Sequence, residues 1–110
     1  MATTYKVLAQ NVLTTGGTAI DLYTVPAATS TVISTAVIAN LTTSATTFRI
    51  AIRPAGATLA NKHYIAYDVA ISANDSTALT LGLTLATTDV VTVNSGTNTV
   101  AFSLYGSEIA

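Results

Sequence analysis

The chain contains few residues that could do acid–base or nucleophilic chemistry. Its only histidine is His63, and its five acidic residues are scattered over 110 positions. A Ser-His-Asp triad would need His63, an acid such as Asp68 or Asp75, and a serine. Such a trio can be chosen from almost any chain this rich in serine, and no pair of acids has a spacing that favours a glycosidase cleft. We therefore expect no catalytic residues and no enzymatic activity.

Metal ligands and phosphate-binding loops are equally scarce. The chain has no cysteine, and Asn74-Asp75 supplies only a few of the about six to eight oxygens that Ca²⁺ takes. Asn and Asp at such a position more commonly stabilise a turn. Gly16-Gly17 stands between two predicted strands, whereas a phosphate-binding glycine loop precedes a helix. We expect neither a metal nor a cofactor.

Most of the basic residues lie close together in one part of the chain. Arg49 and Arg53 project from the same face of a predicted strand, and Lys62-His63-Tyr64 follows the next loop. Arginine and tyrosine are common anchors of protein interfaces. One interpretation is a polar network that contacts a neighbouring subunit, and the alternative is a solvated strand face with weak ion pairs. The interface prediction covers Arg49, Arg53, Lys62, His63, Tyr64 and Asp68.

The composition indicates a subunit of an assembly. Only 8% of the residues are charged, whereas charged residues make up about a quarter of an ordinary soluble domain. Charged side chains keep sheet edges from pairing with other chains. A chain with so few of them suits a protein that is covered by copies of itself or by another protein.

The same composition argues against several classes of partner. A formal net charge of −1 gives no electrostatic footprint for nucleic acid. Threonine and serine interrupt every apolar stretch well short of the ~18 residues of a membrane-spanning helix. The segment Met1–Lys6 lacks the basic and apolar regions of a secretory signal, so we expect no targeting segment.

Alternating apolar and polar residues predict β-strands along the whole chain. Four leucines share one face of the clearest run, Leu79–Leu85, and Phe48, Ile50 and Ile52 share one face of another. The run Thr31–Leu41 has apolar residues on both faces. Either both faces are covered, for example by a neighbouring subunit, or small residues are tolerated on an exposed face. The predicted strands cover residues 5–14, 19–25, 30–41, 46–53, 63–71, 76–85, 89–94 and 98–106.

About eight antiparallel strands in one small domain predict an all-β fold. We expect an antiparallel β-sandwich or jelly roll, with a small closed β-barrel as the alternative. The single domain spans residues 1–110, with residues 1–4 as a flexible N-terminal extension. Each fully buried side chain contributes about 1.5–3 kcal/mol. The expected core consists of Phe48, Ile50, Ile52, Leu79, Leu81, Leu83, Val91, Val93, Val100, Phe102 and Leu104.

Several segments resemble small structural proteins of tailed bacteriophages. They are Leu22–Ala27, the apolar strand ending in Ala39-Asn40-Leu41, Phe48–Gly56, Lys62–Asp68, and the leucine-rich strand followed by Thr88–Val91. The resemblance covers about residues 19–108, which is nearly the whole chain. It implies a β-sandwich without enzymatic activity, either as a free virion protein or as a domain of a tail-associated polypeptide.

The leading hypothesis is a capsid decoration or cement protein, located in the virion and assembled in the host cytoplasm. The expected partners are copies of this chain, in a homo-oligomer, and other virion proteins, above all the major capsid protein; nucleic acid and membranes are not expected. A tail, baseplate or fibre-anchoring subunit is the alternative in the same class. The alternative from another class is a glycan-binding module for host attachment, with Tyr23, Tyr64, Tyr67 and Tyr105 as candidate contacts.

Overall fold

The computed structural model describes residues 2–14 and 16–110. They form eight β-strands, and two short 3₁₀-helices, η1 (Pro54–Gly56) and η2 (Asn61–His63), lie between the fourth and fifth strands. Each strand overlaps one that the sequence predicts, and the largest difference is at the last strand, which ends at Ile109. The strands are β1 (Thr3–Leu13), β2 (Ile20–Thr24), β3 (Ser30–Asn40), β4 (Thr46–Arg53), β5 (Tyr64–Ile71), β6 (Ser76–Leu85), β7 (Val90–Ser95) and β8 (Val100–Ile109).

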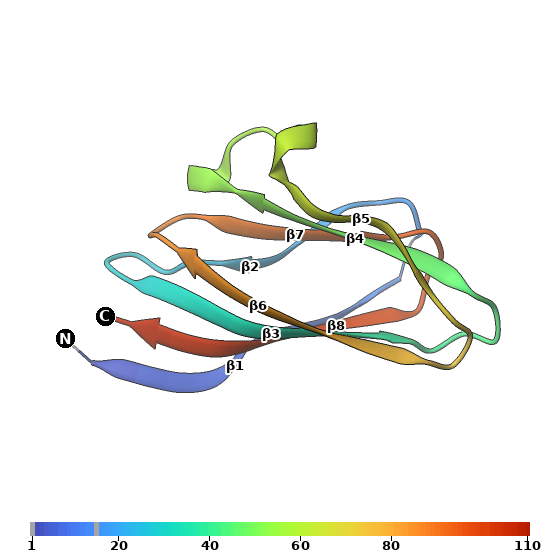
Figure 1. Cartoon of the computed structure of the whole chain (residues 1–110). Helices are drawn as coiled ribbons and strands as arrows, with labels where there is room; N and C mark the ends of the chain where they lie inside the picture. Colours follow the sequence, from blue (N-terminus) through green and yellow to red (C-terminus); the bar gives the residue numbers. More distant parts are fainter. Residues whose placement is uncertain (1, 15) are drawn as a thin grey trace.

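The strands form two four-stranded sheets that pack face to face (Figure 1). One sheet has the order β1-β8-β3-β6 and the other the order β2-β7-β4-β5, and all the pairs are antiparallel. Every connection except β4–β5 crosses from one sheet to the other, which gives the topology of an eight-stranded jelly roll. The sandwich prediction is confirmed. The closed-barrel alternative is wrong, because the edge strands of the two sheets form no ladder with each other.

The core fills the space between the two sheets. Phe48 from β4 meets Phe102 from β8 in an edge-to-face contact, with ring centroids 6.4 Å apart and planes at 76°. Seven of the eleven predicted core residues are buried, and the other four (Ile52, Leu79, Leu81 and Leu83) are half-buried against that core. Period-two alternation therefore identified the inward face of β4, β6, β7 and β8.

A β-bulge explains why apolar residues occur on both faces of β3. The pairing of β3 with β8 steps from Ile33 to Thr35 and leaves Ser34 as an extra residue. Before the bulge Ile33 points into the core, and after it Ala36 and Ile38 do so, although their positions have the opposite parity. Apolar residues thus occur at both odd and even positions of β3 because the register changes within the strand. Neither interpretation of the sequence anticipated this bulge.

The N-terminal segment is part of a sheet, contrary to the predicted flexible extension over residues 1–4. Thr3 and Thr4 belong to β1 and pair with the last residues of β8. Ala2 and Ala110 exchange two backbone hydrogen bonds, of 3.1 and 2.9 Å. The prediction is wrong for residues 2–4 because β8 continues three residues beyond its predicted end and supplies partners for them. Met1 lies outside the described residues.

A polar cluster joins the two sheets at the end where both termini lie (Figure 1). The Tyr23 hydroxyl on β2 donates to Glu108 Oε2 on β8 over 2.5 Å and lies 2.8 Å from Thr31 Oγ1 on β3. Lys6 Nζ donates to the other Glu108 oxygen over 3.2 Å. Burial, and then the bond to Glu108, raise the pKa of Tyr23 to about 12. The bond from Tyr23 and then that from Lys6 hold the pKa of Glu108 below its ordinary value.

The bulge in β3 brings its backbone close to Gly106 on β8, and this contact gives a test of the register. A Cβ at Gly106 would overlap the carbonyl oxygen of Val32. We expect Gly106→Ala to lower the free energy of unfolding by about 2 kcal/mol or more. Chemical denaturation measures this loss. The control is Ser103→Ala on the outward side of the same strand, which should change stability by no more than about 0.5 kcal/mol. Equal stability of the two variants would contradict the register.

Candidate functional site

The two outward faces of the sandwich differ in charge. The face of the β2-β7-β4-β5 sheet carries four charged side chains, Asp21, Arg49, Arg53 and Asp68. Lys6 and Glu108 pair with each other at the end of the sandwich. The other three charged residues, Lys62, Asp75 and Asp89, lie in connecting segments. In the described part of the chain, the outward face of the β1-β8-β3-β6 sheet therefore has no charged side chain; we call it the neutral face.

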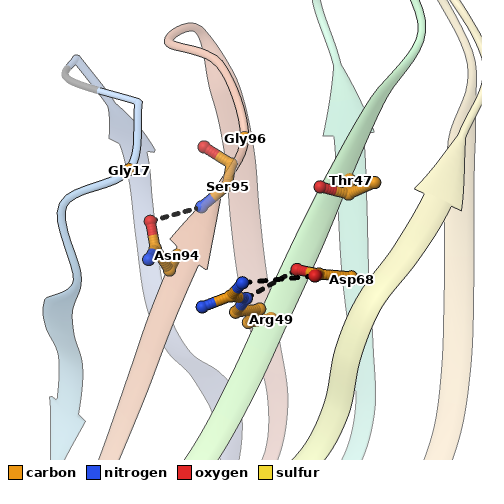
Figure 2. Close-up of a pocket in the computed structure, with 7 residues that line it drawn as sticks. All are labelled: Gly17, Thr47, Arg49, Asp68, Asn94, Ser95 and Gly96. Atoms are coloured by element: carbon orange, nitrogen blue, oxygen red, sulfur yellow. Dashed lines mark hydrogen bonds and ion pairs between the residues drawn. The ribbon is translucent and has the colours of Figure 1, made fainter.

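The charged face is organised around Arg49 on β4 (Figure 2). Its Nε donates to Asp68 Oδ1 over 2.6 Å, and its Nη2 donates to Asp68 Oδ2 over 3.2 Å. The guanidinium carbon lies 4.1 Å from the centroid of the Tyr67 ring. Tyr67 in turn makes an edge-to-face contact with Tyr64, with centroids 4.9 Å apart. Arg49 is thus held by a two-pronged ion pair and by an aromatic ring.

A bulge in β5 makes this arrangement possible. Neighbouring residues of a regular strand point to opposite faces, so Tyr67 and Asp68 would not both reach Arg49. The pairing of β4 with β5 takes one extra residue between Ala66 and Val69, and Asp68 has a left-handed φ of 52°. The irregularity turns both side chains toward Arg49.

The ion pair shifts the pKa of both partners. The hydrogen bonds from Arg49 hold the pKa of the Asp68 carboxyl below its ordinary value, and the same bonds raise the pKa of Arg49. Both side chains are open to solvent, which screens their attraction. The pair therefore orients the two side chains and adds little to the stability of the fold.

Arg53, which the sequence grouped with Arg49, belongs to a separate cluster. Its Nη2 donates to Asp21 Oδ1 over 2.8 Å, and its Nε donates to Thr92 Oγ1 over 2.9 Å. Its Nη1 reaches the backbone oxygens of Gly56 at 3.3 Å and Ala57 at 3.0 Å. Arg53 thus anchors η1 to the sheet.

The remaining predicted residues also separate. His63 is buried, and its Nδ1 accepts a 3.0 Å hydrogen bond from the backbone N–H of Ala60, so it shapes the turn at η2. Lys62 is exposed beside it. Of the six residues, Arg49 and Asp68 pair with each other, and Tyr64 adjoins them through Tyr67. The prediction of one continuous network of six residues is therefore too broad. Their role in an interface stays a prediction.

Two hollows flank the Arg49 cluster. The first has a volume of about 340 Å³, and Figure 2 shows its walls. The second is more open, with a volume of about 430 Å³, and is lined by Asn61, Tyr64 and Tyr67. Arg49 in the wall of the first hollow contacts the ring of Tyr67 in the wall of the second. The lining residues of the first are Gly17, Thr47, Arg49, Asp68, Asn94, Ser95 and Gly96.

Exposed apolar side chains concentrate on two edge strands. Among the described residues, six of the seven large apolar side chains that are exposed lie on β1 or β5, which are edges of different sheets. Tyr5, Val7 and Val12 of β1 are 84%, 47% and 39% exposed. Ile65, Tyr67 and Val69 are the corresponding residues of β5.

No protein-family model matches the chain, and no curated protein matches it. Within residues 2–14 and 16–110, no group of three or more metal-ligating side chains occurs. No helix in this part of the chain has the length and apolar character needed to cross a membrane.

The ion pair predicts how Asp68 titrates. Asp68 should ionise at lower pH than a free aspartate, and Arg49→Gln should raise its pKa toward that of a free aspartate. Asp68 has a lower pKa in the folded than in the unfolded protein, so its ionisation stabilises the fold. This stabilisation is complete at a pH above the unfolded-state pKa, and it is lost as the pH falls through the folded-state pKa. Carboxyl-carbon NMR measures the titration.

The matched control for this titration is Arg53→Gln, which removes the neighbouring arginine from the same strand face. It should leave the pKa of Asp68 unchanged, because Arg53 pairs with Asp21. An Asp68 pKa that responds equally to both substitutions would contradict the geometry.

Proposed function

We propose that the protein is a non-enzymatic structural component of a tailed-bacteriophage virion, acting as a decoration or cement protein of the capsid. The observation that carries the proposal is the neutral face, together with the exposed apolar side chains of β1 beside it. The resemblance of residues 19–108 to small phage structural proteins supports the choice of a virion as the setting.

The two edge strands of this sheet are long and carry almost no charge. Natural edge strands carry charges, prolines or short lengths that prevent pairing with other chains. β1 has eleven residues and no proline, and its one charged side chain, Lys6, is bound to Glu108. β6, at the other edge of this sheet, has ten residues and neither a charge nor a proline. A partner that covers the neutral face would therefore not bury an unpaired charge, which would be costly.

The mechanism is mechanical. Contact across the joints between capsomers adds binding free energy that opposes internal pressure on the shell. The partners are the major capsid protein and further copies of this chain, since closed symmetry allows identical faces to bury one another. The virion is accordingly the proposed location.

The test uses virus particles that lack this protein, with binding measured by co-sedimentation. Wild-type protein should bind intact heads, and Val7→Lys should weaken that binding about tenfold or more, because it places a charge in the interface. The matched control is Ile65→Lys on β5, since Ile65 is 45% and Val7 47% exposed. It should bind as wild type does.

Thermal unfolding shows whether each variant is folded. Binding to isolated tails but not to heads would overturn the capsid assignment in favour of a tail subunit. Heads that bind Val7→Lys as well as wild type would contradict the role of the neutral face.

A further inference from the structure

We infer that the hollows beside Arg49 and Tyr67 form a binding site for a neutral saccharide. The site lies on the outward face of the β2-β7-β4-β5 sheet, opposite the neutral face, so it does not depend on the proposed role in the capsid. The inference rests on four groups around one hollow: the paired Arg49 and Asp68, the Asn94 amide and the Thr47 hydroxyl (Figure 2). The exposed ring of Tyr67 lies next to them, with its centroid 4.1 Å from the guanidinium carbon of Arg49.

The charge of the hollow favours a neutral ligand. Arg49 and Asp68 are the two charged residues among those lining it, and they pair with each other. An anion would have to compete with Asp68 for the guanidinium, and a cation would have to compete with Arg49 for the carboxylate. An uncharged ligand with many hydrogen-bonding groups can use the outer sides of both without breaking the pair.

The polar groups around the hollow match sugar hydroxyls, each of which both donates and accepts. Arg49 uses Nε and Nη2 for Asp68, and its third guanidinium nitrogen lies on the Asn94 side of the hollow (Figure 2). The Asn94 side-chain oxygen accepts a 2.8 Å hydrogen bond from the Ser95 N–H, which leaves its amide N–H groups to donate. Thr47 contributes a hydroxyl to the wall.

The aromatic part of the site supplies an apolar surface. Tyr67 is 54% exposed, and its ring forms a wall of the second hollow together with Tyr64 and Asn61. The C–H groups of a sugar ring pack on such a surface while its hydroxyls reach polar neighbours. Volumes of about 340 and 430 Å³ suit small ligands, since binding pockets span about 300–1,000 Å³.

One residue of this site, Asp68, has a strained backbone. Six non-glycine residues of the described chain have a positive φ, and Asp68 alone among them lies within a strand. Such a conformation costs about 1–3 kcal/mol, and strain of this kind clusters at functional sites. The exposed ion pair that it creates offsets little of this cost. The strained conformation of Asp68 also holds Arg49, Tyr67 and Asp68 in place before a ligand arrives. This lowers the conformational entropy that is lost on binding.

The experiment is an amide NMR titration of the purified protein with neutral saccharides: glucose, galactose, mannose, N-acetylglucosamine, maltose and cellobiose. At least one should shift the amide signals of Arg49, Asp68 and Asn94, with a Kd on the order of 1 mM or below. Glucuronic acid, the anionic counterpart of glucose, should bind more weakly than glucose. If no saccharide of the panel shifts these signals at about 50 mM, far above that Kd, the proposal is overturned.

Two variants locate the binding. Tyr67→Leu and Asn94→Ala should each weaken it about tenfold or more, because one removes the aromatic surface and the other the amide donor. The control Tyr5→Leu removes an exposed tyrosine from β1 of the other sheet and should leave the Kd unchanged. Saccharide binding that survives Tyr67→Leu and Asn94→Ala undiminished would place it elsewhere and overturn the site. Because isolated protein is used, failure here leaves the capsid-binding test unaffected.

Discussion

The contact between the inner faces of the two sheets is the constraint on which the rest of the structure depends. Aliphatic side chains and the Phe48–Phe102 pair fill the space between the sheets, and this burial is the main source of stability in a chain with 8% charged residues. Since the core supplies most of the stability, the two outward faces can differ in their charged side chains. One holds the paired charges, and the other holds none in the described chain, so the two faces suit different partners.

Bulges determine where the side chains of this sandwich point. Ser34 reverses the parity of β3, so that Ile33 before it and Ala36 and Ile38 after it all face the core. The extra residue in β5 brings Tyr67 and Asp68 to the same side and so creates the Arg49 cluster. Bulges occur preferentially at edges and beside functional sites, where they redirect a side chain. A bulge thus directs side chains into the core in β3 and toward the candidate site in β5.

The sequence predicted the strands and the sandwich because alternation has the same period as the inward face of a strand. It also predicted that Arg49 and Asp68 would lie near each other, since both are on strands joined by one loop. It grouped Arg53 and His63 with them, because the sequence does not show that Asp21 reaches Arg53 across β7 or that Ala60 binds His63. Tyr67 was absent from the predicted interface. Regular alternation places it opposite Asp68, and a bulge without glycine leaves no sequence signal.

The central claim is that the neutral face is the surface through which this protein joins a larger particle. A high-resolution image of the assembled particle tests it directly, because the two sheets are distinguishable by the tyrosines and arginines on them. The account predicts that the β1-β8-β3-β6 sheet is covered by neighbouring protein while Arg49, Tyr67 and Asp68 face solvent. A particle in which the neutral face is exposed and the charged face is buried would contradict it.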